Sequence, residues 1–151
     1  FADFIREQKA EALRKGATAH IGMKVEGDHE GSPYLAPEVL TDVNHQMSVM
    51  REESFGPIVG IMKVRDDEEA VALMNDSPYG LTASIWTTDT DHAAAIGDRI
   101  ETGTVFMNRC DYVDPGLVWT GVKDTGKGGG MGLVGYENLT RPKSYHLREA
   151  I

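Results

Sequence analysis

The amino-acid sequence predicts an α/β fold with an open parallel sheet and flanking helices. The prediction rests on the alternation of two kinds of segment between residues 57 and 108. Apolar runs at 57–64, 81–87 and 104–108 are typical of buried strands, and the segments at about 67–75 and 90–101 have helical spacing. Strands that alternate with helices over short connections are typical of parallel sheets with right-handed crossovers.

Several segment ends carry residues that start, stop or interrupt regular structure. Asp66 is followed three residues later by Glu69, which is the spacing of a capping box at a helix start. An opening helix should end near Lys15, because Gly16 accepts the left-handed conformation that terminates helices. Pro37 lies inside the apolar segment 34–43 and limits it to an edge or interrupted strand.

The last third of the chain has a different character. Glycines recur between residues 121 and 135, and an alternating segment follows at 141–147. We expect a long glycine-rich loop and then a terminal strand. Residues 130–135 match the G-x-G-x-x-G pattern of dinucleotide-binding loops, but that pattern requires a preceding strand within a βαβ unit. We therefore interpret these residues as a turning loop.

Composition and charge narrow the class of protein. The 151 residues include 15 Lys and Arg against 24 Asp and Glu, which gives a formal net charge of −9. This charge opposes binding to a nucleic-acid backbone or an anionic membrane. The one cysteine, Cys110, allows no intrachain disulfide and favours a reducing, cytoplasmic compartment. No apolar run is long enough for a membrane span, and the five histidines lack metal-ligand spacing.

Three residues near position 110 could in principle carry chemistry. Cys110 could be a nucleophile, but its neighbour Arg109 would point to the opposite face of a strand, and Asp111 would disfavour a thiolate. We interpret Cys110 as a structural residue. Asp111 and Asp114 could pair as acid and base, but a solvated loop is the simpler interpretation.

The turn at residues 52–57, Glu-Glu-Ser-Phe-Gly-Pro, is more informative. Two carboxylates beside an aromatic ring could bind hydroxyl groups and offer a flat apolar face to a ligand. The alternative is an exposed turn whose phenylalanine anchors it to the core.

Four segments taken together resemble the aldehyde dehydrogenase superfamily. They are residues 34–43, 51–57, 75–81 and 103–108, and both their order and their spacing match. The resemblance covers nearly the whole chain and corresponds to the C-terminal portion of these enzymes. It implies part of an α/β catalytic domain at residues 1–138 and a C-terminal oligomerisation strand or tail at residues 139–151.

The resemblance also implies roles for particular residues. Glu53 corresponds to the family's glutamate that binds the nicotinamide ribose hydroxyls, and Phe55 to the phenylalanine that packs near the nicotinamide. Trp119 corresponds to an aromatic of the substrate tunnel that precedes a glycine-lysine segment. The implied cofactor is NAD or NADP, because the residues that distinguish the two belong to another domain. The segment 110–118 departs from the common sequences and leaves the aldehyde open.

In the family, the nucleophilic cysteine, the general-base glutamate and the cofactor-binding Rossmann unit lie before the segment that corresponds to this chain. We therefore expect no catalytic residue and no metal site here, and we expect the isolated chain to be inactive. The complete enzyme would oxidise an aldehyde through a cysteine thioester, as a homo-oligomer, either dimer or tetramer. The alternatives are a non-catalytic α/β assembly module that acts through its edge strand, and a relative of the acyl-phosphate reductases.

Overall fold

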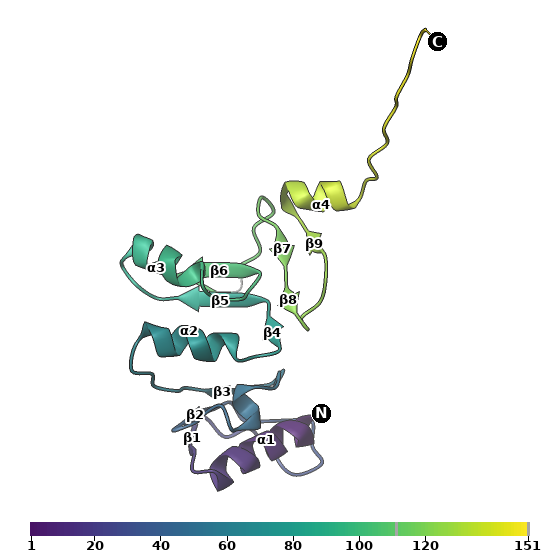
Figure 1. The fold of residues 1–151 in the computed structure, drawn as a ribbon. Coiled ribbons are helices and arrows are strands. Elements are labelled where there is room, and N and C mark those ends of the chain that lie inside the picture. Colours follow the sequence, from purple (N-terminus) through teal and green to yellow (C-terminus); the bar gives the residue numbers. More distant parts are fainter. Residues whose placement is uncertain (111, 151) are drawn as a thin grey trace. The chain divides into compact units, whose positions relative to one another are not determined.

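The three-dimensional structure, a computed structural model, describes residues 1–110 and 112–150 (Figure 1). The chain divides into two compact units, residues 1–76 and residues 77–151, and each is described here by itself. The sequence contains no obvious linker at this division, because α2, which ends the first unit, is followed directly by the turn that starts the second.

The first unit is a three-stranded mixed sheet with two α-helices. Its elements are α1 (Ala2–Arg14), β1 (Thr18–Ile21), β2 (Glu38–Thr41), the 3-10 helix η1 (Ser48–Met50), β3 (Ile58–Gly60) and α2 (Asp67–Asn75). The strand order is β1-β2-β3, and β2 pairs with β3 in parallel. The antiparallel pairing of β1 with β2 was not predicted, because β1 is short and mostly exposed.

The core of the first unit lies where the end of α1, strand β2 and the segment around η1 meet. Leu40 on β2 and Met47 before η1 are almost completely buried. The full cluster comprises Ala12, Ala17, Leu40, Val43, Met47 and Val49. Burial of large side chains such as Leu and Met contributes roughly 1.5–3 kcal/mol each, so this cluster anchors α1 and the segment that leads to residues 52–57.

The helix ends in the first unit follow the sequence signals. Gly16 has φ of 100°, which is the left-handed conformation expected just after α1. At the start of α2, Asp66 Oδ1 accepts a hydrogen bond of 2.9 Å from the Glu69 amide. The carboxylate of Glu69 accepts from the backbone and side chain of Arg65, not from the Asp66 amide, so the capping box is only half formed.

The second unit consists of short strand pairs and two helices. Its elements are β4 (Tyr79–Gly80), β5 (Thr82–Ile85), α3 (Thr90–Gly97), β6 (Thr104–Met107), β7 (Trp119–Thr120), β8 (Val122–Lys123), β9 (Gly129–Gly130) and α4 (Gly132–Asn138). Strands β5 and β6 pair in parallel with α3 as their crossover, which confirms the predicted strand-helix-strand unit. The pairs β4-β8 and β7-β9 are antiparallel.

Two elements of the second unit end earlier than predicted. Helix α3 stops at Gly97 and not near residue 101. A Cβ at Gly97 would lie 3.2 Å from a methyl group of Val105 on β6. The glycine thus lets the end of the helix pack closely on the strand. The apolar run at 81–87 forms a regular strand only over Thr82–Ile85.

The loop before β6 approaches β7 at a single glycine. A Cβ built on Gly103 would overlap the carbonyl oxygen of Thr120. Gly103 also donates a backbone hydrogen bond of 3.2 Å to the Gly80 carbonyl, so its backbone cannot move away without losing this bond. Only glycine fits at this contact.

The glycine-rich stretch was predicted to be a long loop, and this expectation is partly wrong. Residues 129–130 form β9 and residues 132–138 form α4, a seven-residue helix. Glycine disfavours helices, which is why the sequence did not indicate one here. Because β9 pairs antiparallel with β7, the stretch is not part of a βαβ unit, which agrees with the rejection of the dinucleotide-binding pattern. The interpretation of residues 130–135 as a turning loop is wrong, since Gly130 ends β9 and residues 132–135 begin α4.

The predicted terminal strand at 141–147 does not form within the chain. A strand exists only where backbone groups pair with a second strand, and these residues make no such pair here. Residues 141–148 are exposed and have no regular structure. None of the helices within residues 1–110 and 112–150 is long and apolar enough to cross a membrane.

Candidate functional site

The turn at residues 52–57 is fixed at both of its ends. It leaves η1 through a hydrogen bond of 2.8 Å from the Glu52 amide to the Ser48 carbonyl, and it enters β3 directly after Pro57. The Glu38 amide donates to the Pro57 carbonyl at 2.9 Å. The buried segment before η1 and the edge of β2 therefore hold the turn in place.

Phe55 adopts an unusual backbone conformation at the centre of this turn. Its φ is 45°, and its side chain is 80% exposed. The left-handed conformation costs a non-glycine residue roughly 1–2 kcal/mol. The alternative interpretation, a phenylalanine anchored in the core, is therefore wrong. A strained turn that presents an exposed aromatic ring is typical of a ligand-binding position.

Glu53 offers a free acceptor two residues before this ring. Its side chain is exposed, and within residues 1–110 and 112–150 it has no hydrogen bond or ion pair to another residue. A carboxylate carries two acceptor oxygens and can accept from two neighbouring hydroxyl groups. Glu53 and Phe55 together thus present a charged acceptor and an apolar ring on one short segment.

A groove of about 540 Å³ lies beside Phe55. One wall is the turn itself, and the others come from the start of α1 and from the loop that precedes β2. The lining residues are Phe1, Ala2, Asp3, Ile5, Gly31, Ser32, Pro33, Tyr34, Leu35, Phe55, Gly56 and Pro57. Their aromatic and apolar surfaces, with a few polar groups, suit a flat ring that carries a polar end.

Gly56 allows α1 to approach the turn. A Cβ at Gly56 would overlap the Cδ1 methyl of Ile5 and lie 3.4 Å from Ile5 Cγ1. Ile5 is buried, so α1 packs directly against the backbone next to Phe55. The position of α1 therefore determines the position of the aromatic ring.

Trp119, the predicted substrate-tunnel residue, lies in the second unit. It is half-buried on β7 and pairs with Gly130 of β9. Lys123, which follows on β8, has φ of 56°, and its ammonium binds Glu101 at 2.7 Å and the Ser77 carbonyl at 3.0 Å. Lys123 thus joins β8 to the segments that precede β4 and β6.

The residues near position 110 form no catalytic arrangement in the described part of the chain. The thiol of Cys110 is exposed, and the Arg109 guanidinium lies 3.8 Å from the centre of the Tyr112 ring. Asp114 accepts a hydrogen bond of 2.8 Å from the Gly116 amide, which is typical of a turn. Asp111 lies outside the described residues. Within the described residues no cluster of His, Cys, Asp or Glu could hold a metal ion.

The sequence did not reveal the groove walls, because they come from distant segments. Phe1 and Tyr34 received no role, although Tyr34 lies in a segment that carries the family resemblance. The one available signal was the spacing of Asp3 and Arg6, which allows an ion pair on one helix face. That pair proves to be part of a larger cluster that binds the loop before β2, which lines the groove.

The fold and the site define an α/β protein with parallel strand pairs and an exposed Glu-x-Phe turn beside an aromatic groove. A model of the Aldehyde dehydrogenase family matches residues 2–145. The chain belongs to this family.

Individual relatives agree with this assignment. The succinate-semialdehyde dehydrogenase [NADP(+)] of Deinococcus radiodurans is 37% identical over 139 residues, which is 92% of this chain and 29% of that protein. The Mycobacterium tuberculosis aldehyde dehydrogenase complexed with NAD+ is similar in structure, with a TM-score of 0.81, 33% identity, and coverage of 95% of this chain and 31% of that one.

The NADP-dependent glyceraldehyde-3-phosphate dehydrogenase from Bacillus halodurans, complexed with NADP, has a TM-score of 0.77 and 41% identity, and the match covers 85% of this chain and 26% of that one. The chain thus spans less than a third of the length of these relatives.

Proposed function

We propose that the chain is the C-terminal part of an NAD(P)-dependent aldehyde dehydrogenase that oxidises an aldehyde to a carboxylic acid through a cysteine thioester. The observation that carries this proposal is the turn at residues 52–57, where the strained, exposed Phe55 lines an aromatic groove and the exposed Glu53 carboxylate lies two residues before it. Family membership supplies the reaction class. In this proposal the nucleophilic cysteine belongs to another part of the enzyme, and Cys110 is not a catalytic residue.

The groove and the turn beside it fit the nicotinamide end of the cofactor. Glu53 would accept hydrogen bonds from the ribose hydroxyls, and Phe55 would pack against the ring. When bound, the nicotinamide supplies the acceptor for the hydride that leaves the aldehyde. The contribution of this chain is positional, because a rigid acceptor and a rigid ring reduce the freedom of the reacting group.

NAD and NADP both remain candidates for this cofactor. Solved structures of relatives contain NAD+ in one case and NADP in others. The groove beside Phe55 would hold the nicotinamide end, which is the same in the two cofactors, so it does not distinguish them.

Trp119 would line the substrate tunnel of the complete enzyme. Its half-buried position on β7, held by the pairing with β9, provides a stable aromatic surface. The relatives are named for aldehydes of different polarity, among them succinate semialdehyde and geranial. We therefore propose an aldehyde as the substrate class and no particular compound.

The proposal also includes an oligomeric state and a cellular location. Residues 139–151 would form an oligomerisation tail, and residues 1–138 part of the catalytic domain, within a dimer or tetramer. The exposed apolar side chains of Tyr145 and Leu147 in the unpaired tail support this role. A cytoplasmic location is supported by the exposed free thiol of Cys110, since exposed thiols persist in reducing compartments.

Replacement of Glu53 by Gln in the complete enzyme tests the proposal. The change keeps the size of the side chain but removes the charge, and hydrogen bonds to charged groups contribute about 1.5–3 kcal/mol, so kcat/KM should fall roughly tenfold to a hundredfold. Single-turnover formation of NAD(P)H measures hydride transfer, and ester hydrolysis by the same enzyme serves as the control that needs no hydride transfer. Equal losses in the two reactions, or no loss in either, would remove Glu53 from the cofactor site.

A further inference from the structure

We propose that Arg6 is a positioning residue that holds the loop wall of the groove that Phe55 also lines, and that it thereby sets the affinity for the nicotinamide cofactor. The wall is the loop of residues 28–36, which contributes Gly31, Ser32, Pro33, Tyr34 and Leu35 to the groove. This inference rests on the function proposed above, and it concerns a residue to which the family resemblance assigns no role.

The guanidinium of Arg6 binds four acceptors. It donates to Asp3 Oδ1 at 2.6 Å on its own helix and to Asp28 Oδ1 at 3.1 Å at the start of the loop. It also donates to the carbonyl oxygens of Ser32 at 2.9 Å and Tyr34 at 2.7 Å. A single side chain of α1 thus contacts the loop at three points, and the planar five-donor fork of arginine is suited to this task.

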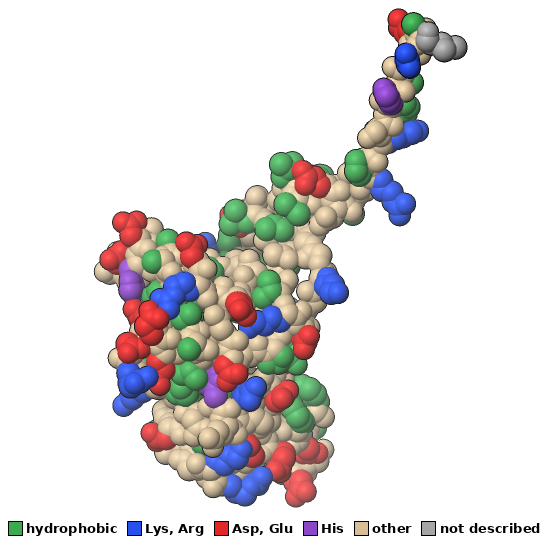
Figure 2. All heavy atoms as spheres, viewed as in Figure 1, with side chains coloured by type: hydrophobic (Ala, Val, Ile, Leu, Met, Phe, Trp, Pro, Cys, Tyr) green, Lys and Arg blue, Asp and Glu red, His purple; other side chains and the backbone are tan. Residues whose placement is uncertain are grey.

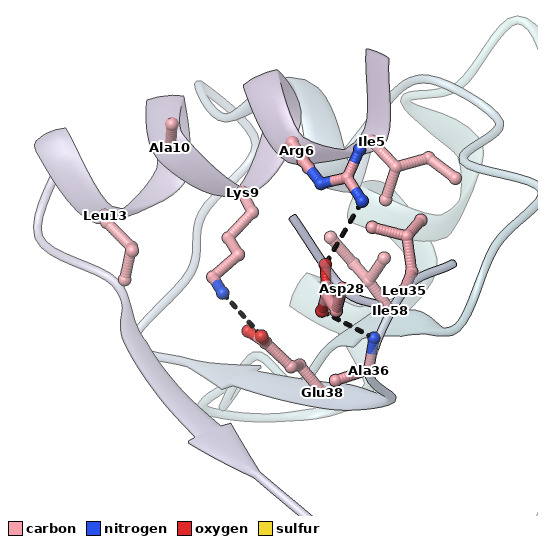
Figure 3. A pocket seen from close by; sticks show the side chains of 10 residues that line it. All are labelled: Ile5, Arg6, Lys9, Ala10, Leu13, Asp28, Leu35, Ala36, Glu38 and Ile58. Atoms are coloured by element: carbon pink, nitrogen blue, oxygen red, sulfur yellow. Dashed lines mark hydrogen bonds and ion pairs between the residues drawn. The ribbon is translucent and has the colours of Figure 1, made fainter. Parts of the chain in front are cut away.

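The two carboxylates extend this contact to the loop backbone. Asp3 Oδ1 accepts a hydrogen bond of 3.1 Å from the Gly31 amide. Asp28 Oδ2 accepts one of 2.8 Å from the Ala36 amide, and Figure 3 shows Asp28 between Arg6 and Ala36. Residues 28–36 have no strand and no α-helix, so these bonds restrain their shape together with turn bonds inside the loop, such as that from the Ser32 amide to the His29 carbonyl.

The other basic side chains of α1 bind different partners. Lys9 binds the buried Glu38 at 2.5 Å and fixes α1 to β2 (Figure 3). Arg14 binds only Glu7, on the same helix, and both side chains are largely exposed. Of these three basic residues Arg6 is the one that binds the loop, and its side chain is only 20% exposed.

The electrostatics of the cluster agree with this geometry. The hydrogen bond from Arg6 and that from the Gly31 amide hold the pKa of Asp3 below its usual value. The Ala36 amide, and then Arg6, lower the pKa of Asp28 in the same way. Both carboxylates therefore stay ionised and keep their acceptor oxygens across the neutral pH range.

The test combines a structural measurement on the chain with a kinetic measurement on the complete enzyme. Arg6→Ala should raise the exchange rates of the Gly31 and Ala36 amides by at least about tenfold, while the Leu40 amide in β2 is unchanged. In the enzyme, the KM for NAD+ or NADP+ should rise about tenfold, with kcat within about twofold, because ground-state binding is lost. Arg14→Ala is the matched control, and it should change none of these values.

Each outcome bears on the inference. Unchanged exchange at Gly31 and Ala36 would show that Arg6 does not hold the loop. Faster exchange with an unchanged cofactor KM would show that the loop is not part of the cofactor groove. In both cases the inference is wrong, while the Glu53→Gln experiment still decides the proposed function.

If Arg6→Ala does not fold, Arg6→Lys replaces it in both measurements. Lysine keeps the charge but not the planar fork, so it should show smaller changes in the same directions. Full retention of the Gly31 and Ala36 protection and of the cofactor KM in Arg6→Lys would overturn the inference.

Discussion

The side chain of Ile5 occupies the space that a Cβ on Gly56 would need. This contact joins α1 to the turn that carries Phe55. The contact therefore couples the helix to the segment that carries the aromatic ring, although α1 ends at Arg14 and the ring belongs to Phe55.

Gly56→Ala should destabilise the first unit. The added methyl would force Ile5 from its rotamer, and overpacking of this kind costs roughly 1–3 kcal/mol. The double variant Ile5→Val, Gly56→Ala removes the overlapping Cδ1 methyl and should recover part of this loss. Urea unfolding measures both effects. Gly22→Ala is the control, because its nearest contact would be the Pro37 carbonyl oxygen at 3.9 Å. Equal costs at positions 22 and 56 would contradict the packing argument.

Acid should weaken the Arg6 cluster. Asp3 and Asp28 have pKa values below their ordinary 3.8 in the folded chain, chiefly through hydrogen bonds from Arg6 and from the Gly31 and Ala36 amides. The unfolded chain therefore binds more protons, so the stabilisation is complete above the ordinary value and is lost as the pH falls through the folded values.

Urea unfolding from pH 6 down to pH 2.5 measures this dependence. The double variant Asp3→Asn, Asp28→Asn should lose stability less steeply below about pH 4 than the parent chain does, because the two titrating groups are gone. A slope as steep as that of the parent chain would assign the acid sensitivity to other carboxylates.

The isolated chain should not oxidise aldehydes with either nicotinamide cofactor. The proposed nucleophile and base are absent from it, and Cys110 has no base beside it in the described residues. The measurement is NAD(P)H absorbance with a panel of aldehydes. Turnover that survives purification and disappears in Cys110→Ala would contradict the assignment of Cys110 as non-catalytic.

Truncation after Asn138 should weaken self-association of the complete enzyme. The tail presents Tyr145 and Leu147 to solvent, and Figure 2 shows basic side chains along it. The tail is basic, because it carries three cationic side chains and one carboxylate: Arg141, Lys143, Arg148 and Glu149. Its removal takes the formal net charge of the 151-residue chain from −9 to −11. Light scattering should give a smaller assembly for the truncated enzyme. An unchanged mass would exclude the tail from the interface.

Some parts of the structure could be predicted from the sequence, and the reasons are local. Helix α2 begins and ends where predicted, because Asp66 caps it and the apolar spacing is regular. The parallel β5-β6 pair followed from two apolar runs around a helix. Strand β1 and helix α4 were missed, since one is exposed and lacks alternation and the other contains glycines that disfavour a helix.

The candidate site could likewise be predicted only in part. Residues Glu53 and Phe55 could be identified, because they lie in one contiguous motif. The positive φ of Phe55 and the groove beside it could not, since both depend on where α1 and the loop at 28–36 pack. Contacts between distant segments, such as those of Arg6 with Ser32 and Tyr34, leave no local signal.

The close approach of Gly103 to the Thr120 carbonyl has a genetic consequence. Every amino acid reached from a glycine codon by one base change carries a Cβ, and a Cβ at this position would overlap the carbonyl oxygen. Missense changes at codon 103 should therefore displace the backbone and destabilise the second unit. Codon 130 differs, because a Cβ at Gly130 would meet nothing within 4 Å. Glycines that look alike in the sequence are thus subject to very different constraints on missense variation.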